Sequence, residues 1–330
     1  MQTIGIIGGG AWGTALAQSF ASTGKQCMIW AREERVVDSI NIGHENALFL
    51  PGVKLSTNIR ATGILREAAK ADILIIVTPA QYLRTTLQTL KPDLDAAKPL
   101  VICAKGIEIE SGLMLSQIAQ EVVPDSPLAI LTGPTFAAEI ARGLPSAVTL
   151  AMKDKESAKA LAEVLSSRTL RMYAADDIIG AQVGGAVKNV IAIACGIIEG
   201  RKLGDSARAA LVTRGLAEIA RLASALGAKK ETLMGMCGVG DLILTCSSMQ
   251  SRNFSLGAAL GQGMTLKEIL ESRNSVTEGV YTAEALVVMA RNNAVEMPIS
   301  EAVHACLQDG ADVGQIIEKM LDRPVKTETV

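Results

Sequence analysis

Near its N-terminus the chain reads Thr3-Ile4-Gly5-Ile6-Ile7-Gly8-Gly9-Gly10-Ala11-Trp12-Gly13. The apolar run at its start predicts a buried strand, and the residues from Ala11 to Ser22 have the spacing of a helix that ends near Gly24. A GxGxxG segment alone is a weak signal. Here it lies between a predicted strand and a predicted helix, which is the context that a dinucleotide-binding turn requires.

Each glycine of this segment has a separate expected task. Gly8 would permit the tight turn, Gly10 would let the backbone approach a pyrophosphate, and Gly13 would allow close packing of helix and strand. The N-terminus of the helix would add free amides and a favourable dipole. A glycine-rich turn without a ligand is the alternative interpretation.

Apolar runs recur through the first half of the chain, with helical patterns between them. Several are continuous rather than alternating, as expected for strands covered on both faces. This alternation predicts an α/β domain with a doubly wound, mostly parallel sheet over residues 1–176. The further predicted strands are Gln26 to Trp30, Asp72 to Val77, Leu100 to Cys103, Leu128 to Leu131 and Ala147 to Ala151.

The pattern changes near residue 175. Residues Asp177 to Gly200 predict one long apolar helix, and no convincing strand follows. Residues 177–330 are therefore expected to form an all-α domain. Its other predicted helices are Ser206 to Leu226, Val276 to Asn292 and Ser300 to Asp309.

Composition excludes several classes of protein. Of 330 residues, 49% are hydrophobic and the net charge is −2, which argues against a disordered chain and against a nucleic-acid partner. Six cysteines without a CxxC, and only two histidines, make a disulfide framework or a zinc site unlikely, and no metal is expected.

The most apolar runs are shorter than a membrane span, and no basic leader precedes the first of them. We therefore expect a cytoplasmic protein without stable membrane insertion.

The cofactor's ribose would lie at the end of the second predicted strand. A site specific for NAD usually carries an acidic residue there, whereas this chain has Arg32 followed by Glu33 and Glu34. The guanidinium of Arg32 could pair with a 2′-phosphate and so favour NADP. A solvated surface arginine is the alternative, and the two glutamates leave NAD possible.

Three loops follow predicted strands, where ligands of such sheets bind. They are Val77-Thr78-Pro79-Ala80, Ala104-Lys105-Gly106 and Thr132-Gly133-Pro134-Thr135-Phe136-Ala137. Lys105 offers a cation on which an anionic group could dock, although a single lysine is more often a solvated surface charge. The first loop could equally be a plain strand–helix turn.

Lys188 and Asn189 are the only strongly polar residues between Gly184 and Glu199 of the long apolar helix. A lysine there must either reach water or face a polar cleft. Because burial lowers the pKa of a lysine, Lys188 is the best candidate for proton transfer near neutral pH.

Two polar clusters follow. Asp241 comes after the turn Gly238-Val239-Gly240, so it could cap a helix or be the partner of a catalytic lysine. Ser251, Arg252 and Asn253 could hold a phosphate at a helix N-terminus, and alone they are also a plausible capping sequence.

Taken together, these segments resemble bacterial NAD(P)-dependent glycerol-3-phosphate dehydrogenases, from Gly8 to about Pro298. The resemblance also includes Gly184-Gly185-Ala186-Val187-Lys188-Asn189, Thr213-Arg214-Gly215-Leu216-Ala217-Glu218, Gly240-Asp241-Leu242, Thr245-Cys246 and Val276-Thr277-Glu278-Gly279. It implies a Rossmann domain followed by a helical domain, and a homodimer. The implied reaction is the reversible reduction of dihydroxyacetone phosphate to sn-glycerol 3-phosphate, with NADPH or NADH, for glycerophospholipid synthesis.

The resemblance also implies the site residues. Lys188 would be the general acid in reduction and the base in oxidation, with Asp241 as its partner. The implied substrate contacts are Lys105, Gly133, Thr135, Lys188, Asp241, Ser251, Arg252 and Asn253. The implied cofactor contacts, besides the glycines, are Ala11, Trp12, Arg32, Lys105, Ala137, Arg252, Val276 and Glu278.

Two other functions fit parts of the pattern. One is a two-domain dehydrogenase of a 3-hydroxy acid or a sugar acid phosphate, which would accept a carboxylate substrate. The other is a redox-sensing regulator that binds a dinucleotide without turnover. The first would be expected to lack the Gly-Pro-Thr-Phe-Ala and Ser-Arg-Asn loops, and the second predicts no chemistry that depends on Lys188.

Overall fold

The computed structural model describes residues 2–272 and 277–324. Contacts divide the chain into two compact units. The first unit comprises Met1–Ala104 and Leu115–Ile178, and the second comprises Lys105–Met114 and Ile179–Val330. The segment Lys105–Met114 thus belongs to the second unit although it lies within the first half of the sequence.

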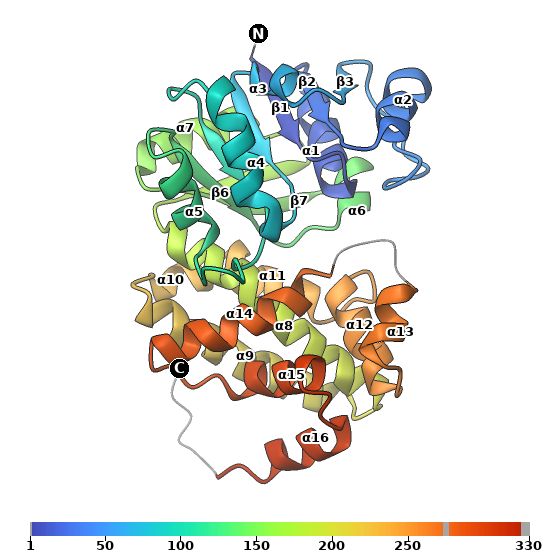
Figure 1. The fold of residues 1–330 in the computed structure, drawn as a ribbon, viewed down its shortest axis with the longest axis vertical. Coiled ribbons are helices and arrows are strands. Elements are labelled where there is room, and N and C mark those ends of the chain that lie inside the picture. The colour runs from blue at the N-terminus through green and yellow to red at the C-terminus, as the bar shows by residue number, and fades with distance from the viewer. Residues whose placement is uncertain (1, 273–276, 325–330) are drawn as a thin grey trace. The chain divides into compact units, whose positions relative to one another are not determined.

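The first unit is built on one eight-stranded sheet with the order β3-β2-β1-β4-β5-β6-β7-β8 (Figure 1). All neighbours pair in parallel except β6 and β7, which are antiparallel. The predicted mostly parallel, doubly wound sheet is therefore confirmed. The strands are β1 (Thr3–Ile7), β2 (Gln26–Trp30), β3 (Ile59–Thr62), β4 (Ile73–Ile76), β5 (Leu100–Ile102), β6 (Leu128–Thr132), β7 (Ser146–Met152) and β8 (Leu170–Ala175).

The sequence did not predict the two edge strands, β3 and β8. In β8 the buried Leu170 and Met172 alternate with exposed Arg171 and Tyr173. An edge strand has one side open to solvent, so it lacks the continuous apolar run that marked the central strands.

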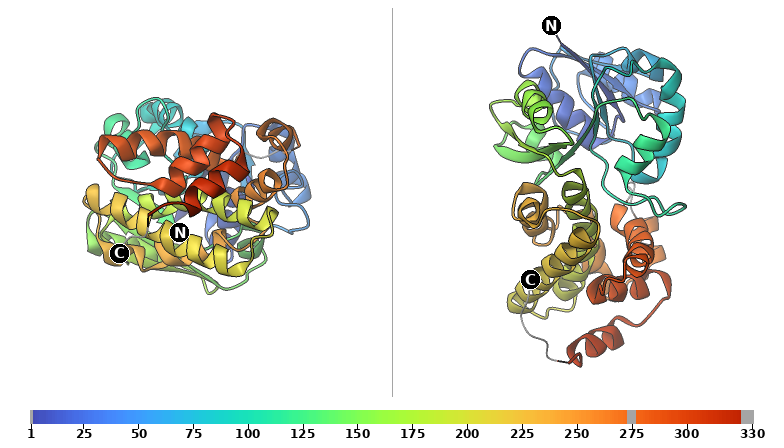
Figure 2. Two further views of the ribbon diagram at one scale, coloured as in Figure 1. Left: turned by 90° about the horizontal axis from the view of Figure 1, so that it is seen from below. Right: turned by 90° about the vertical axis from the view of Figure 1, so that its left-hand side faces the viewer.

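Helices cover both faces of the sheet (Figure 2). α1, α6 and α7 share one hydrophobic cluster with alternate residues of the strands, whereas α3, α4 and α5 pack in succession against one another. The helices are α1 (Ala11–Ala21), α2 (Glu34–Gly43), α3 (Leu65–Ala69), α4 (Leu83–Leu90), α5 (Leu115–Val122), α6 (Ala137–Ala141) and α7 (Lys155–Leu165), with short 3₁₀ turns at Ala80–Tyr82 and Lys91–Asp93.

The second unit is helical throughout the part that the structure describes after residue 178. A π-type turn at Met236–Gly240 precedes α11. The helices are α8 (Ile178–Gly200), α9 (Asp205–Ala225), α10 (Lys230–Leu233), α11 (Asp241–Thr245), α12 (Arg252–Gly261), α13 (Leu266–Glu271), α14 (Glu278–Asn292), α15 (Pro298–Gln308) and α16 (Val313–Leu321).

Helix α8 is the core of this unit. By length and composition it could cross a membrane, which the apolar runs read from the sequence had not indicated, but 83% of its most apolar window is buried in the protein. Small residues bring α12 against it. A Cβ on Gly196 would lie 2.0 Å from the carbonyl oxygen of Phe254, and one on Gly257 would lie 2.0 Å from that of Ile193. This contact holds the start of α12 beside α8.

Candidate active site

The glycine turn of the first unit has the geometry of a pyrophosphate cradle. Gly8 has φ +129°, which L side chains rarely adopt, and a Cβ on Gly13 would lie 2.1 Å from the carbonyl oxygen of Gly8. A Cβ on Gly10 would meet nothing within 4 Å. No side chain caps α1, which begins at Ala11. The turn therefore offers open backbone at a helix N-terminus, and it fits the pyrophosphate of a dinucleotide.

A buried asparagine that the sequence did not single out supports this turn. The Asn46 amide nitrogen donates to the carbonyl oxygen of Gly9 and to the hydroxyl of Thr14, each at 2.8 Å. Thr14 in turn donates to the carbonyl oxygen of Gly10 at 2.9 Å. Asn46 lies more than thirty residues from the turn, so no local pattern could have revealed it.

Gly10→Ala should separate cofactor binding from folding. Because a Cβ at Gly10 meets nothing and its φ of −73° suits alanine, we expect the melting temperature to be unchanged. The methyl group would stand where the pyrophosphate must approach, so we expect the dissociation constant for NADPH to rise about tenfold or more, the equivalent of at least ~1.4 kcal/mol. Fluorescence titration measures the affinity, and Gly43→Ala, at another open glycine, is the control. Unchanged affinity would remove Gly10 from the cofactor site.

Arg32 follows β2, as predicted, and its side chain is 80% exposed. It forms an ion pair with Glu33 at 3.0 Å. An exposed ion pair of this kind contributes little to stability, so breaking it to bind another anion through the guanidinium requires little free energy.

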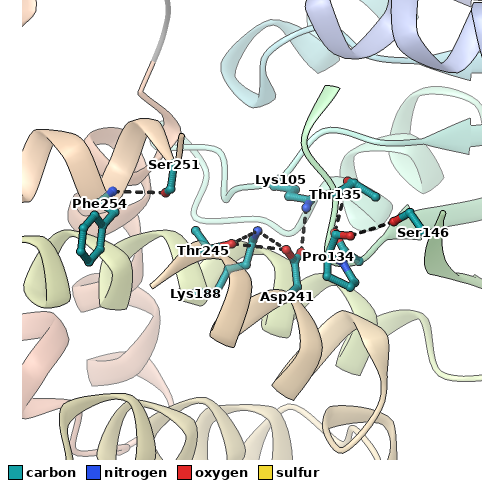
Figure 3. A network of polar contacts seen from close by, with 10 residues as sticks. Lys105, Pro134, Thr135, Ser146, Lys188, Asp241, Thr245, Ser251 and Phe254 are labelled. Carbon is teal, nitrogen blue, oxygen red and sulfur yellow. Dashed lines mark hydrogen bonds and ion pairs between the residues drawn. The ribbon is translucent and has the colours of Figure 1, made fainter. Parts of the chain in front are cut away.

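Three predicted residues of the first unit, Gly133, Thr135 and Ala137, lie just after the end of β6. Gly133 and Thr135 are in the loop that follows this strand, and the Thr135 hydroxyl donates to the carbonyl oxygen of Gly133 at 3.4 Å. Ser146 donates to the carbonyl oxygen of Pro134 at 3.0 Å and fixes the loop to β7 (Figure 3). Ala137 is the first residue of α6.

In the second unit, two lysines share one buried carboxylate (Figure 3). The Lys188 Nζ lies 2.5 Å from Asp241 Oδ1, and the Lys105 Nζ lies 2.8 Å from Asp241 Oδ2. The side chains of Lys188 and Asp241 are 6% and 1% exposed, whereas that of Lys105 is 22% exposed. The structure therefore brings together three predicted residues that lie far apart in the sequence, and Asp241 is a partner of lysines rather than a helix cap.

This arrangement changes the pKa values of both buried groups. Burial lowers the pKa of Lys188 to about 7, with Asp241 opposing the fall and Lys105 adding to it. Burial alone would raise the pKa of Asp241, but the two ammonium groups outweigh it and lower that pKa below its usual value. Asp241 thus stays ionised at neutral pH, while Lys188 can be either charged or neutral.

Thr245 is a member of this cluster that the sequence did not identify as a site residue. The Lys188 Nζ donates to the Thr245 hydroxyl at 2.7 Å, and the hydroxyl lies 3.3 Å from Asp241 Oδ1. Thr245 is four residues after Asp241 on α11, so both side chains lie on one face of the helix. That spacing was the signal available in the sequence. The cluster fixes the direction of the Lys188 amine from two sides.

The phosphate candidates lie at the start of α12. The Ser251 hydroxyl accepts a hydrogen bond from the Phe254 amide at 3.2 Å, so Ser251 caps this helix. Arg252 is exposed in the first turn, and Glu278 lies near enough to interact with it electrostatically. The Asn253 Oδ1 accepts from the Gly279 amide at 3.0 Å, which ties α12 to α14. Val276 lies outside the described residues.

A doubly wound sheet with a glycine turn that fits a pyrophosphate, and a helical unit with a buried lysine–carboxylate cluster, are features of the two-unit nicotinamide-dependent dehydrogenases. Family models for NAD-dependent glycerol-3-phosphate dehydrogenase match both parts of the chain. The N-terminal model matches residues 3–158, and the C-terminal model matches residues 177–318. The chain belongs to the NAD-dependent glycerol-3-phosphate dehydrogenase family, and it is an oxidoreductase with a nicotinamide cofactor.

Individual relatives agree with this assignment over the full length. The chain is 55% identical to glycerol-3-phosphate dehydrogenase [NAD(P)+] of Parvibaculum lavamentivorans, covering 99% of this chain and 98% of the relative. It is 56% identical to the enzyme of that name from Rhodospirillum rubrum, covering 98% and 93%. The crystal structure of glycerol-3-phosphate dehydrogenase from Coxiella burnetii has a TM-score of 0.94 and 37% identity, covering 98% and 99%.

Proposed function

We propose that this protein catalyses the reversible reduction of dihydroxyacetone phosphate to sn-glycerol 3-phosphate for glycerophospholipid synthesis, with Lys188 as general acid and base. The observation that carries the proposal is the buried cluster of Lys188, Lys105 and Asp241, with an amine whose pKa of about 7 suits proton transfer in both directions. Family membership supports the substrate.

The bound nicotinamide supplies or accepts a hydride at the substrate carbon. The chain must stabilise the alkoxide that develops on the neighbouring oxygen and then deliver a proton to it. With both lysines protonated, the cluster carries two positive charges and one negative charge, and its net charge of +1 favours an oxyanion. In reduction the proton passes from the Lys188 Nζ to the alkoxide. In oxidation the neutral amine takes the proton back.

The substrate phosphate needs a separate anchor. We assign this to Arg252, with Ser251 and Asn253 beside it, because Arg252 is exposed at a helix N-terminus where backbone amides and the dipole also favour an anion. Because the Asn253 oxygen is engaged with Gly279, its amide nitrogen is the group available to the phosphate. Gly133 and Thr135 remain further predicted contacts. Holding the phosphate would orient the carbonyl toward Lys188.

For the cofactor we propose the glycine turn with Ala11 and Trp12, together with Ala137, Lys105, Arg252, Val276 and Glu278 as predicted from the resemblance. We propose that Arg32, which is exposed after β2, binds the 2′-phosphate of NADPH, while Glu33 and Glu34 leave NADH as an alternative cofactor. Formation of a homodimer and a cytoplasmic location remain predictions.

Arg32→Ala should weaken the binding of NADPH more than the binding of NADH. A charge-assisted contact to phosphate is worth about 1.5–3 kcal/mol, so we expect the Michaelis constant for NADPH to rise roughly tenfold or more while that for NADH stays nearly constant. Steady-state kinetics with both cofactors measures the ratio, and Arg35→Ala, three residues further on, is the control. Equal losses with both cofactors would show that Arg32 does not bind the 2′-phosphate.

Lys105→Met should move the pH profile of the reaction. Lys105 holds down the pKa of Lys188, so removing its charge should raise that pKa above about 7. Reduction requires the protonated amine, and its kcat/KM falls as pH rises through this pKa. We therefore expect the falling limb to move to higher pH in Lys105→Met and to stay near its original position in Lys105→Arg. If the fall of kcat/KM occurs at the same pH in Lys105→Met as in wild type, the electrostatic coupling between the two lysines is contradicted.

The proposed function is tested by adding dihydroxyacetone phosphate to the protein and NADPH and following the loss of NADPH absorbance. A keto acid is run in parallel. Oxidation with dihydroxyacetone phosphate alone supports the proposal, whereas oxidation only with the keto acid would favour a hydroxy-acid dehydrogenase.

A further inference from the structure

Three consecutive glycines leave one peptide of the glycine turn without a side chain on either side. A Cβ on Gly9 would lie 2.6 Å from the Cβ of Ala31, so close packing requires glycine there, whereas Gly10 is open. A peptide between two glycines can rotate at little steric cost, because neither neighbour has a Cβ. The Gly9–Gly10 peptide is therefore free to turn either its N–H or its carbonyl oxygen toward a bound anion, unless another group holds it.

Asn46 holds this peptide from the interior of the first unit. The residue is fully buried, and its amide nitrogen donates to the carbonyl oxygen of Gly9 at 2.8 Å. Among the described residues no other group donates to that oxygen, whereas the carbonyl oxygen of Gly10 accepts from both the amide and the hydroxyl of Thr14. The direction of the Gly9 carbonyl thus depends on Asn46.

The other contacts of Asn46 fix the orientation of its own side chain. Its Oδ1 accepts from the Phe49 amide at 3.1 Å, and its Nδ2 also donates to the Thr14 hydroxyl at 2.8 Å. The backbone is tied as well, because the Leu50 amide donates to the Asn46 carbonyl oxygen at 2.8 Å. With the oxygen engaged in this way, the nitrogen must face the turn. The position therefore requires an amide rather than a carboxylate, which has no hydrogen to donate.

Fixing the Gly9 carbonyl also fixes the amide that follows it. The described chain contains no cis peptide bond, and in a trans peptide the C=O and the N–H point in opposite directions. The Gly10 N–H therefore points away from Asn46. It has no hydrogen-bond partner among the described residues, and no side chain caps α1, which begins at the next residue. This N–H is the first of the free amides that an anion at the N-terminus of α1 would meet.

We propose that Asn46 is a positioning residue for the cofactor, which locks the Gly9–Gly10 peptide so that the Gly10 N–H faces the pyrophosphate. A reversed peptide would place the Gly9 carbonyl oxygen beside the pyrophosphate, and it would replace a charge-assisted hydrogen bond with a repulsive contact. The proposal rests on the cofactor role proposed for the glycine turn. It adds a residue between α2 and β3 that acts through the turn.

Cofactor binding by Asn46→Leu and Asn46→Asp tests this role without the reaction. Leucine removes the side-chain hydrogen bonds without adding charge, and aspartate keeps the shape but cannot donate when ionised. We expect the dissociation constant for NADPH to rise roughly tenfold or more in both, the loss that one hydrogen bond to a charged group produces. The inhibition constant of adenosine 2′-phosphate, which lacks the pyrophosphate, should stay unchanged. Fluorescence titration measures the first quantity and competition with NADPH the second.

Two further variants separate positioning from a general loss of stability. Asn41 joins the backbone of Ala61 through two hydrogen bonds of 2.8 and 2.9 Å, elsewhere in the same unit. Asn41→Leu should lower the melting temperature as Asn46→Leu does, but it should leave the affinity for NADPH unchanged. Thr14→Val removes a hydroxyl partner of Asn46 and keeps the bond to Gly9, so it should bind NADPH nearly as wild type does.

Four results would overturn the proposal. Wild-type affinity for NADPH in Asn46→Leu would show that the turn does not need this residue, and weak binding in Asn46→Asp alone would assign the effect to the added charge. Equal losses for NADPH and adenosine 2′-phosphate, or failure of both variants to fold, would limit Asn46 to the stability of the unit. A wrong substrate would be seen separately, as wild type that binds NADPH but does not oxidise it with dihydroxyacetone phosphate.

Discussion

Lys188→Met should lower kcat by about 10³-fold in both directions while the affinity for NADPH stays unchanged. The variant keeps the length of the side chain but removes the amine that we assign to proton transfer and to stabilisation of the alkoxide, and such groups contribute roughly 10²–10⁴-fold. The glycine turn belongs to the other unit, so cofactor binding should persist. Stopped-flow measurement of NADPH oxidation, with fluorescence titration of the cofactor, checks both parts.

Two controls make this result specific to the amine. Lys267→Met removes an amine whose side chain is 84% exposed, and it should leave kcat unchanged. Added methylamine should restore part of the rate of Lys188→Ala, because the shortened side chain leaves a space beside Asp241 and Thr245 that a small amine can enter. A Lys188→Met enzyme with the wild-type rate would remove Lys188 from the mechanism.

Asp241→Asn should lower kcat by roughly 10²-fold or more and also destabilise the protein. The amide cannot balance the two ammonium groups, and breaking a buried ion pair costs about 3–5 kcal/mol. We expect about 3 kcal/mol, because Lys188 can lose its proton and so avoid part of the cost. The midpoint of urea unfolding measures the change in stability.

The pH profile separates this role of Asp241 from a purely structural one. Asp241 raises the pKa of Lys188 against the effect of burial, so in Asp241→Asn that pKa should fall further below about 7. The falling limb of the reduction profile should then move to lower pH, opposite to the shift expected for Lys105→Met. Asp205→Asn, which alters an exposed ion pair with Arg208, should change neither property. A loss of stability with an unmoved limb would limit Asp241 to a structural role.

The sequence predicted the central part of the first unit because its signals are local. β1, β2 and α1 were found within one residue of their observed bounds, since apolar runs and a glycine turn mark them directly. The edge strands β3 and β8 were missed because the exposed Arg60 interrupts the short β3, and exposed Arg171 and Tyr173 alternate with buried residues in β8. The antiparallel pairing of β7 with β6 depends on how the chain returns to the sheet, which no local pattern specifies.

For the site, too, local patterns predicted single residues but not the contacts between residues that lie far apart in the sequence. Lys188 was identified because a lysine within an apolar helix is conspicuous, but its contact with Asp241, 53 residues away, could only be anticipated as a possibility. Asn46 is an ordinary polar residue in the sequence, and only the three-dimensional structure reveals its partners. Thr245 was signalled only by its spacing of four residues from Asp241, and its contact with Lys188 also required the structure. The assignment of Lys105–Met114 to the second unit likewise had no signal in composition or spacing.

The most direct test of the central claim is a comparison of wild type and Lys188→Met in one assay, the oxidation of NADPH on addition of dihydroxyacetone phosphate. We predict rapid oxidation by wild type, none with a keto acid, and almost none by the variant although it still binds NADPH. Equal rates for the two proteins, or oxidation by wild type only with the keto acid, would contradict the assignment of this cluster to glycerol 3-phosphate chemistry.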